Sequence, residues 1–117
     1  MSAGAPLPER PCPLETYLEV VAGAWTPRIL WCLLQGHPYR FADFQRALPG
    51  ISPKVLTRKL RDLERHHLVR RTAYPGAVPH VEYALTQRAA VLAPVFAAME
   101  EAAETLFGPS PAGDGGA

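Results

Sequence analysis

The sequence has few of the residues that build disulfide networks or zinc sites. Its 117 residues include two cysteines and four histidines, and these do not follow the spacing of a zinc-binding motif. Two cysteines cannot hold a disulfide framework, so we expect reduced thiols and a cytoplasmic location. The sequence therefore predicts neither a bound metal nor another cofactor.

Long apolar runs are also missing. No stretch reaches the roughly 18 residues of a membrane-spanning helix, and no apolar run follows a basic N-terminal start as in a signal peptide. We therefore expect no membrane association. The sequence also lacks a Gly-rich phosphate loop, a metal-binding spacing and a nucleophile motif, so an enzyme is the least favoured class of function.

The net charge is small, but the charged residues are unevenly distributed along the chain. The net charge is only +1, yet residues 52–71 hold seven of the twelve lysines and arginines and two of the eleven acidic residues. This segment thus carries an excess of positive charge, and the rest of the chain is slightly acidic. One concentrated basic segment in a nearly neutral chain indicates directed binding of a polyanion.

The basic segment has the spacing of an amphipathic helix. Its cations recur at i, i+4, i+7 and i+11, and so share one stripe: Lys54, Arg58, Arg61 and Arg65. Leucines follow i, i+4 and i+7 on the opposite side: Leu56, Leu60 and Leu63. Cations alone on a solvated face would repel one another, whereas that face is favourable against nucleic acid.

Proline and glycine punctuate the rest of the chain. Residues 1–11 and 107–117 lack periodicity and are predicted to be a flexible N-terminal arm and a disordered tail. Residues 12–106 are predicted to form one folded domain. Four helices are expected in its first part, from Cys12-Pro13 to Gly23, from the Thr26-Pro27 cap to Gly36, over residues 41–48, and from Ser52 to about His66.

The pattern then changes to strands. Residues 68–74 and 80–85 are predicted to pair as a hairpin with a five-residue tip. Thr86 is expected to cap a last helix to about Leu106, with Pro94 causing a bend or an irregular start. A helix-turn-helix followed by a hairpin makes a mainly α winged helix-turn-helix.

Three segments carry a resemblance to a known family: CPLETYLEVVAGAW, RFADFQRALPGISPKVLTRKLRDLERHHLVRR and VEYALT. Together they resemble the HxlR-type transcriptional regulators, small winged helix-turn-helix relatives of the MarR group. The resemblance covers about residues 12–106. It implies a homodimer that is built from the first and last helices, binds double-stranded DNA at an inverted repeat and acts as a repressor. One departure is His80, where the family often has arginine.

Position along the basic helix predicts the role of each residue. Residues near the N-terminus of a recognition helix reach base edges, and later residues meet phosphates. The candidates for base readout are Ser52, Lys54, Thr57 and Arg58, and those for phosphate contact are Arg61 and Arg65. Lys59 lies toward the flank and is a weaker candidate. The hairpin offers further DNA contacts at Arg70, Arg71, Tyr74 and His80, although strand alternation sends Arg70 and Arg71 to opposite faces.

The two cysteines have different predicted environments. Cys12 lies where a helix begins, and a helix N-terminus stabilises a thiolate. In some HxlR-type regulators a cysteine near the first helix senses electrophiles or oxidants, so the resemblance makes Cys12 a redox-sensing candidate. A structural cap or an inert residue is the alternative. Cys32 lies in the apolar RILWCLL segment and is predicted to be a small buried side chain.

Two further interpretations stay open at this stage. Five aromatic residues suit either core and dimer packing, which we favour, or the wall of a pocket for a small-molecule effector: Tyr17, Trp25, Trp31, Phe41 and Phe44. A winged helix can also be a protein-interaction module without sequence-specific DNA binding, because fold alone does not determine function.

Overall fold

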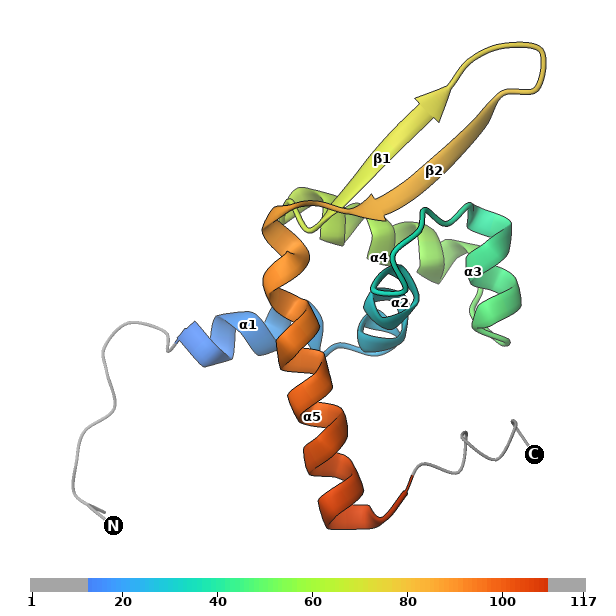
Figure 1. Ribbon diagram of the computed structural model, residues 1–117. Coiled ribbons are helices and arrows are strands. Elements are labelled where there is room, and N and C mark those ends of the chain that lie inside the picture. Colours follow the sequence, from blue (N-terminus) through green and yellow to red (C-terminus); the bar gives the residue numbers. More distant parts are fainter. Residues whose placement is uncertain (1–12, 110–117) are drawn as a thin grey trace.

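The computed structural model describes residues 13–109, so the predicted arm, Cys12 and most of the predicted tail lie outside the described residues. The chain forms mainly helices with one antiparallel hairpin (Figure 1), which confirms the predicted winged helix-turn-helix. The elements in chain order are α1 (Pro13–Val21), α2 (Thr26–Leu33), α3 (Phe41–Ala47), α4 (Pro53–Arg65), β1 (Val69–Tyr74), β2 (His80–Leu85), the 3₁₀-helix η1 (Arg88–Val91) and α5 (Leu92–Phe107).

The elements form a helical body with two projections (Figure 1). The hairpin leaves the body in one direction, and α5 runs along the body and then beyond it in the opposite direction. Fully buried side chains from α2, α3 and α4 meet in the body: Ile29, Leu30, Phe44, Leu56, Leu60 and Leu63. The core therefore fixes the helix-turn-helix, while the hairpin and the end of α5 extend from it. Within residues 13–109, every helix is too short or too polar to cross a bilayer.

The hairpin has the predicted five-residue tip, and its first strand begins one residue later than predicted, at Val69. Val69 pairs with Leu85 and Tyr74 with His80, and residues 75–79 form the tip. A short bridge joins it to the body, because Tyr39 and Tyr83 exchange backbone hydrogen bonds of 2.8 and 2.7 Å. The sequence pattern did not predict this bridge. It ties the α2–α3 connection to β2, so the root of the hairpin is fixed against the helix-turn-helix.

The start of α2 differs from the prediction. Thr26 is the first residue of α2 rather than its cap, and Trp25 occupies the capping position in a left-handed conformation, with φ of 72°. The Trp25 side chain makes no capping hydrogen bond. Instead the Thr26 side chain is buried at 3% exposure. Packing of Thr26 against the core thus overrides its preference for the cap.

The C-terminal helix begins irregularly, as Pro94 predicted. The Thr86 hydroxyl accepts a hydrogen bond of 3.2 Å from the Ala89 amide, but the turn that it starts is the 3₁₀-helix η1. The predicted α-helix from Thr86 was therefore too long at its start. Thr86 also donates a hydrogen bond of 2.7 Å to the His67 carbonyl, which links this turn to the end of α4.

Candidate nucleic-acid interface

Helix α4 is held by its apolar face and its N-terminal cap. Leu56, Leu60 and Leu63 are at most 1% exposed. The Ser52 hydroxyl accepts a hydrogen bond of 3.1 Å from the Val55 amide, and Pro53 is the first helical residue. The predicted boundaries and buried face of α4 are confirmed. Because these contacts fix the orientation of α4, they also fix the direction of its opposite face, which is exposed to solvent.

That outward face brings the predicted cations together. A shallow hollow of about 560 Å³ follows it, and its lining residues are Pro53, Lys54, Thr57, Arg58, Arg61 and Arg65. All four cations are exposed, and Thr57 is half-buried. Among residues 13–109, Lys54, Arg58 and Arg61 form no ion pair. Their charges are therefore available to a polyanion, and the hollow gives it a surface to lie against.

Arg65 differs from the other three cations. Its guanidinium forms an ion pair with Asp62, one turn earlier on α4. Helical spacing alone did not predict this pair, and Asp62 itself does not line the basic hollow. Both side chains remain substantially exposed. Such a surface pair contributes little stability, so a phosphate would compete with Asp62 for Arg65 at small cost.

Lys59 points away from the basic face. It is half-buried beside a hollow of about 170 Å³ between α1 and α4, which Glu19 and Asp62 also line. Its Nζ lies 3.2 Å from the position that a Cβ would take at Gly23. Gly23 was predicted to end the first helix, but α1 ends at Val21. The absence of a side chain at Gly23 makes room for the Lys59 amine instead.

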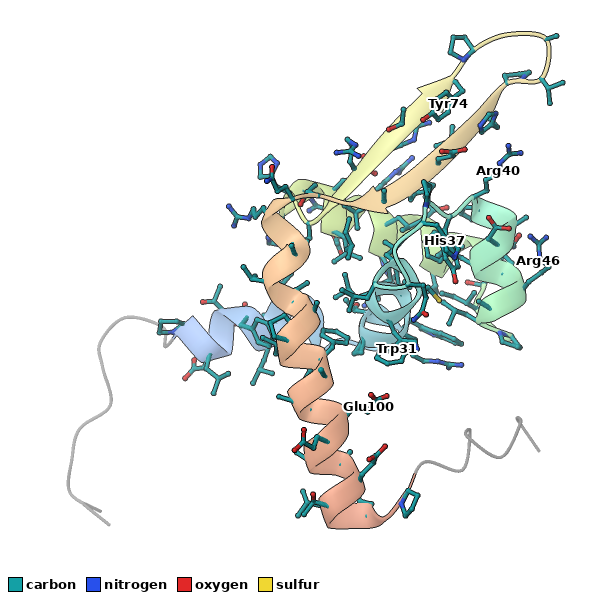
Figure 2. The ribbon with its side chains drawn as sticks, in the orientation of Figure 1. Trp31, His37, Arg40, Arg46, Tyr74 and Glu100 are labelled. Carbon is teal, nitrogen blue, oxygen red and sulfur yellow. The ribbon has the colours of Figure 1, made fainter. Side chains whose placement is uncertain are left out.

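The hairpin places its predicted contact residues in solvent. Arg70 and Arg71 are both exposed, although they are neighbours in one strand and so lie on opposite faces of the hairpin. Tyr74 stacks on His80 near the tip, with ring centroids 4.8 Å apart and planes 17° apart. His80 Nε2 lies 3.1 Å from a Glu82 carboxylate oxygen. The stack restricts the Tyr74 ring on one side, and Figure 2 shows Tyr74 near the end of β1.

Arg40 is a cation that the sequence pattern missed. It occupies the capping position of α3, where the Asp43 carboxylate accepts a hydrogen bond of 2.9 Å from its backbone amide. Its side chain is exposed and points away from the body on the side of the hairpin (Figure 2). The signal was its place at the start of the first helix of a helix-turn-helix, a common position for phosphate contact. Arg46, farther along α3, pairs with Asp43.

Cys32 is buried, as predicted, at 6% exposure. Burial raises the pKa of its thiol, although a hydrogen bond from the Tyr39 hydroxyl and the charge of Arg28 act in the opposite direction. A thiol with a raised pKa carries little thiolate at neutral pH and reacts slowly. Cys12, the predicted sensor, lies outside the described residues. Within residues 13–109, no three histidine, cysteine or acidic side chains are grouped closely enough to hold a metal.

The aromatic residues divide between core and cleft. Phe44 is fully buried, and Tyr17, Trp25 and Phe41 pack against the core while partly exposed. Trp31 is 44% exposed and lines a cleft between α2 and α5. The favoured core interpretation is thus confirmed for Phe44, whereas Trp31 belongs to the wall of a cleft.

The structure combines a capped helix that has one buried apolar face and one exposed basic face, the helix-turn-helix that contains this helix, and a hairpin attached to that motif. Together these features define a winged helix-turn-helix DNA-binding protein. The model of the HxlR-like helix-turn-helix family matches residues 20–110. The chain therefore belongs to this family of transcriptional regulators, as its sequence motifs predicted.

Individual relatives agree with this assignment. The HTH-type transcriptional regulator YdeP of Bacillus subtilis (strain 168) is 38% identical over 90 residues, which are 77% of this chain and 70% of that protein. The structure of the redox regulator HypR in its oxidized form superposes with a TM-score of 0.73 at 36% identity, over 80% of this chain and 96% of that chain. Reduced YodB from B. subtilis gives 0.75 at 30% identity, over 86% and 99%.

Proposed function

We propose that the protein is a cytoplasmic, homodimeric repressor that binds a specific inverted-repeat operator and has no enzymatic activity. The observation that carries this proposal is the outward face of α4. Three cations there have no ion-pair partner among the described residues, and the helix beneath them is fixed by three buried leucines. A rigid basic helix of this kind suits the major groove.

Position along α4 supports a division of roles. Ser52, Lys54, Thr57 and Arg58 lie toward its N-terminus and are the proposed readers of base edges. Arg61 and Arg65 lie in its second half and are proposed to contact phosphates, Arg65 after release from Asp62.

The hairpin is proposed to contact the backbone or the minor groove beside the recognition helix. Its candidate contacts are Arg70, Arg71, Tyr74 and His80. The stack of Tyr74 on His80 supports this proposal because a restricted ring loses less conformational entropy on binding.

The apolar surface of α1 and α5 supports the homodimer. Leu14 and Leu18 of α1 are 59% and 44% exposed, and Leu106 and Phe107 at the end of α5 are 72% and 85% exposed. Large apolar side chains gathered on two helices indicate an interface. A two-fold dimer would place its two α4 helices about 34 Å apart, one turn of B-DNA, on an inverted repeat.

Cys12 is the proposed redox sensor of this regulator. The name of HypR as a redox regulator supports the idea for the family, and the slow reaction expected of Cys32 leaves Cys12 as the reactive thiol. Treatment with diamide should lower operator affinity in the wild type and leave Cys12→Ser unaffected. Equal loss in both proteins would remove Cys12 from the mechanism.

A gel-shift experiment with the DNA upstream of the gene tests the main proposal. We expect a complex that survives excess unrelated DNA, and Lys54→Ala or Arg58→Ala should both weaken it and relax its sequence preference. If the dimer neutralises about eight phosphates, the logarithm of affinity should fall with the logarithm of salt at a slope near −7. A slope near zero, or binding without sequence preference, would favour the protein-interaction module instead.

A further inference from the structure

The tip of the hairpin is apolar and carries no charge. It is the part of the hairpin farthest from the helical body (Figure 1). Its five residues are all exposed: Pro75, Gly76, Ala77, Val78 and Pro79. Val78 keeps 78% of its surface exposed, and the two prolines donate no backbone hydrogen bond. The tip therefore offers a phosphate no cation, and its main contact surface is apolar.

The charged side chains of the hairpin lie closer to the body. Arg70 and Arg71 are near the start of β1, and Glu82 pairs with Thr72 in the strand register. Tyr74 follows Arg71 by three residues, which corresponds to a rise of about 10 Å along a strand. The minor groove of B-DNA is about 7.5 Å deep. With an arginine at the phosphates that border this groove and the hairpin directed into it, the tip would reach the bases.

Two residues at the base of the tip restrict its position. Tyr74 and His80 form the last pair of the strand register, and their ring centroids are 4.8 Å apart. His80 Nδ1 lies 3.4 Å from the Val78 carbonyl oxygen, and His80 Nε2 lies 3.1 Å from a Glu82 carboxylate oxygen. The imidazole ring thus connects the backbone at Val78 to both strands. A tip restricted in this way loses less conformational entropy on binding than a free loop.

Continuity with the basic face of α4 indicates what the tip contacts. α4 packs against β1, and the Tyr39–Tyr83 bridge joins the root of the hairpin to the helix-turn-helix. A duplex that lies on α4 would therefore meet the exposed Arg70 and Arg71 next, and the tip after them. A protein partner would need acidic groups for the arginines and an apolar site for the tip. A DNA groove supplies phosphates and stacked bases together.

We propose that the hairpin tip is an apolar wedge, in which Val78, beside Pro79, enters the minor groove next to the recognition helix and partly separates two stacked base pairs. This inference rests on the proposed function. It goes beyond a groove contact, because it gives the protein a second activity, the bending of its operator. Apolar wedges kink a duplex by roughly 20–90°. Pyrimidine–purine steps unstack most easily, so the wedge would select such a step in each half-site.

Fluorescence of 2-aminopurine tests the unstacking directly, because this adenine analogue brightens when it loses its stacking neighbours. It replaces each adenine of the upstream DNA in turn, and the full chain is added to saturation. We expect an increase confined to one step in each half-site. Val78→Ala should abolish the increase, and Val78→Ile should retain it. Val91→Ala is the matched control, because it shortens a 68% exposed valine on η1, outside the hairpin.

Gel mobility of circularly permuted fragments measures the bend in the same complexes. Val78→Ala should still form a specific complex, because the cations of α4 and the hairpin remain, but its bend should be smaller than that of the wild type. Replacing a TA step at the brightened position by AA keeps the A·T pattern of the minor groove but stiffens the DNA. This replacement should lower wild-type affinity about tenfold and affect Val78→Ala much less.

Three results would each overturn the wedge: no fluorescence increase at any step, equal bends for wild type and Val78→Ala, or the same loss of signal in Val91→Ala. A specific complex on straight DNA would overturn the wedge and leave the proposed function intact. Absence of any specific wild-type complex would overturn the proposed function and the wedge with it. The gel shift of the wild type alone distinguishes these two failures.

Discussion

The two longest described helices, α4 and α5, use their apolar side chains in different ways. In α4 the leucines are buried in the core of the same chain, and the exposed face is polar. In α5 only Leu92 and Phe96 near its start are buried, and Met99, Leu106 and Phe107 farther along are 46%, 72% and 85% exposed. The chain thus buries the apolar face of α4 within its own core. The second half of α5 needs another apolar surface, which is the strongest structural support for the proposed dimer.

The largest expected effect comes from the buried side of α4. Leu60→Ala should lower the free energy of unfolding by about 2–5 kcal/mol, because it removes fully buried methyl groups and leaves a cavity. Urea denaturation followed by circular dichroism measures this. Leu106→Ala, at an exposed position, is the control at concentrations where the protein is monomeric. A loss below about 1 kcal/mol for Leu60→Ala would contradict the difference between the two helices.

Substitutions on the exposed side of α5 should change the affinity of the dimer rather than the stability of the fold. Leu106→Glu places a charge on each side of the proposed interface, and we expect dimer affinity to fall on the order of a hundredfold. Sedimentation velocity measures the dimer, and the melting temperature of the monomer should stay unchanged. Val78→Glu, at the 78% exposed hairpin tip, is a matched control that should leave association intact. A Leu106→Glu protein that stays dimeric would move the interface elsewhere.

Two cations of α4 provide a smaller but sharper contrast. Arg61→Ala should weaken binding to all DNA sequences and reduce the salt slope by about 1, because one phosphate contact is lost. Lys59→Ala removes the same charge from the side of α4 that faces α1, and it should leave the slope unchanged. The measurement is a salt titration of operator binding. Equal salt slopes for the two variants would mean that the face of α4 on which a cation lies does not affect its contribution to DNA binding.

Two substitutions of Ser52 distinguish an effect on folding from an effect on DNA binding. Ser52→Ala should lower stability by about 1 kcal/mol, because the Val55 amide loses its capping acceptor. Ser52→Asp keeps an acceptor and should retain stability, but its charge would repel DNA and weaken operator binding. Thermal unfolding and gel shift distinguish the two effects. Unchanged operator affinity in Ser52→Asp would exclude Ser52 from the interface.

The smallest expected effect lies at the end of α4. His67 has φ of 60°, in the left-handed region, and the amide of the next residue, Leu68, donates a 3.0 Å hydrogen bond to the Leu63 carbonyl. His67→Gly should therefore stabilise the protein by about 0.5 kcal/mol, since it relieves the backbone strain at a partly offsetting entropic cost. Thermal unfolding measures this, and the adjacent His66→Gly, at a negative φ, should destabilise instead. A less stable His67→Gly protein would show that the His67 side chain contributes to packing.

Periodicity and turn residues were sufficient to predict α4 and the hairpin, because both are defined by local signals. The leucine spacing, the Ser52-Pro53 start and the PGAVP tip are each contained in a few consecutive residues. Tertiary packing determined the features that the sequence did not predict. Thr26 is buried in the first turn of α2 and does not act as its cap, and the Tyr39–Tyr83 bridge joins residues that are far apart in sequence.

The candidate interface was predictable to the same extent. Helical spacing placed Lys54, Arg58 and Arg61 on one exposed face, but it could not show that Arg65 pairs with Asp62. The cleft between α2 and α5 had no sequence signal beyond a set of aromatic residues, because its walls come from three elements. The roles of all these residues in binding stay predictions until they are measured.

The contact between Lys59 and Gly23 limits how the recognition helix can be exchanged. A methyl group at residue 23 would lie 3.2 Å from the Lys59 amine, so the turn after α1 and the inner flank of α4 must be compatible. A graft that transfers the specificity of another regulator should therefore replace only the outward positions of α4. Lys59 belongs to the inner flank and should be kept in such a graft, because its amine lies in the space that the missing side chain of Gly23 leaves.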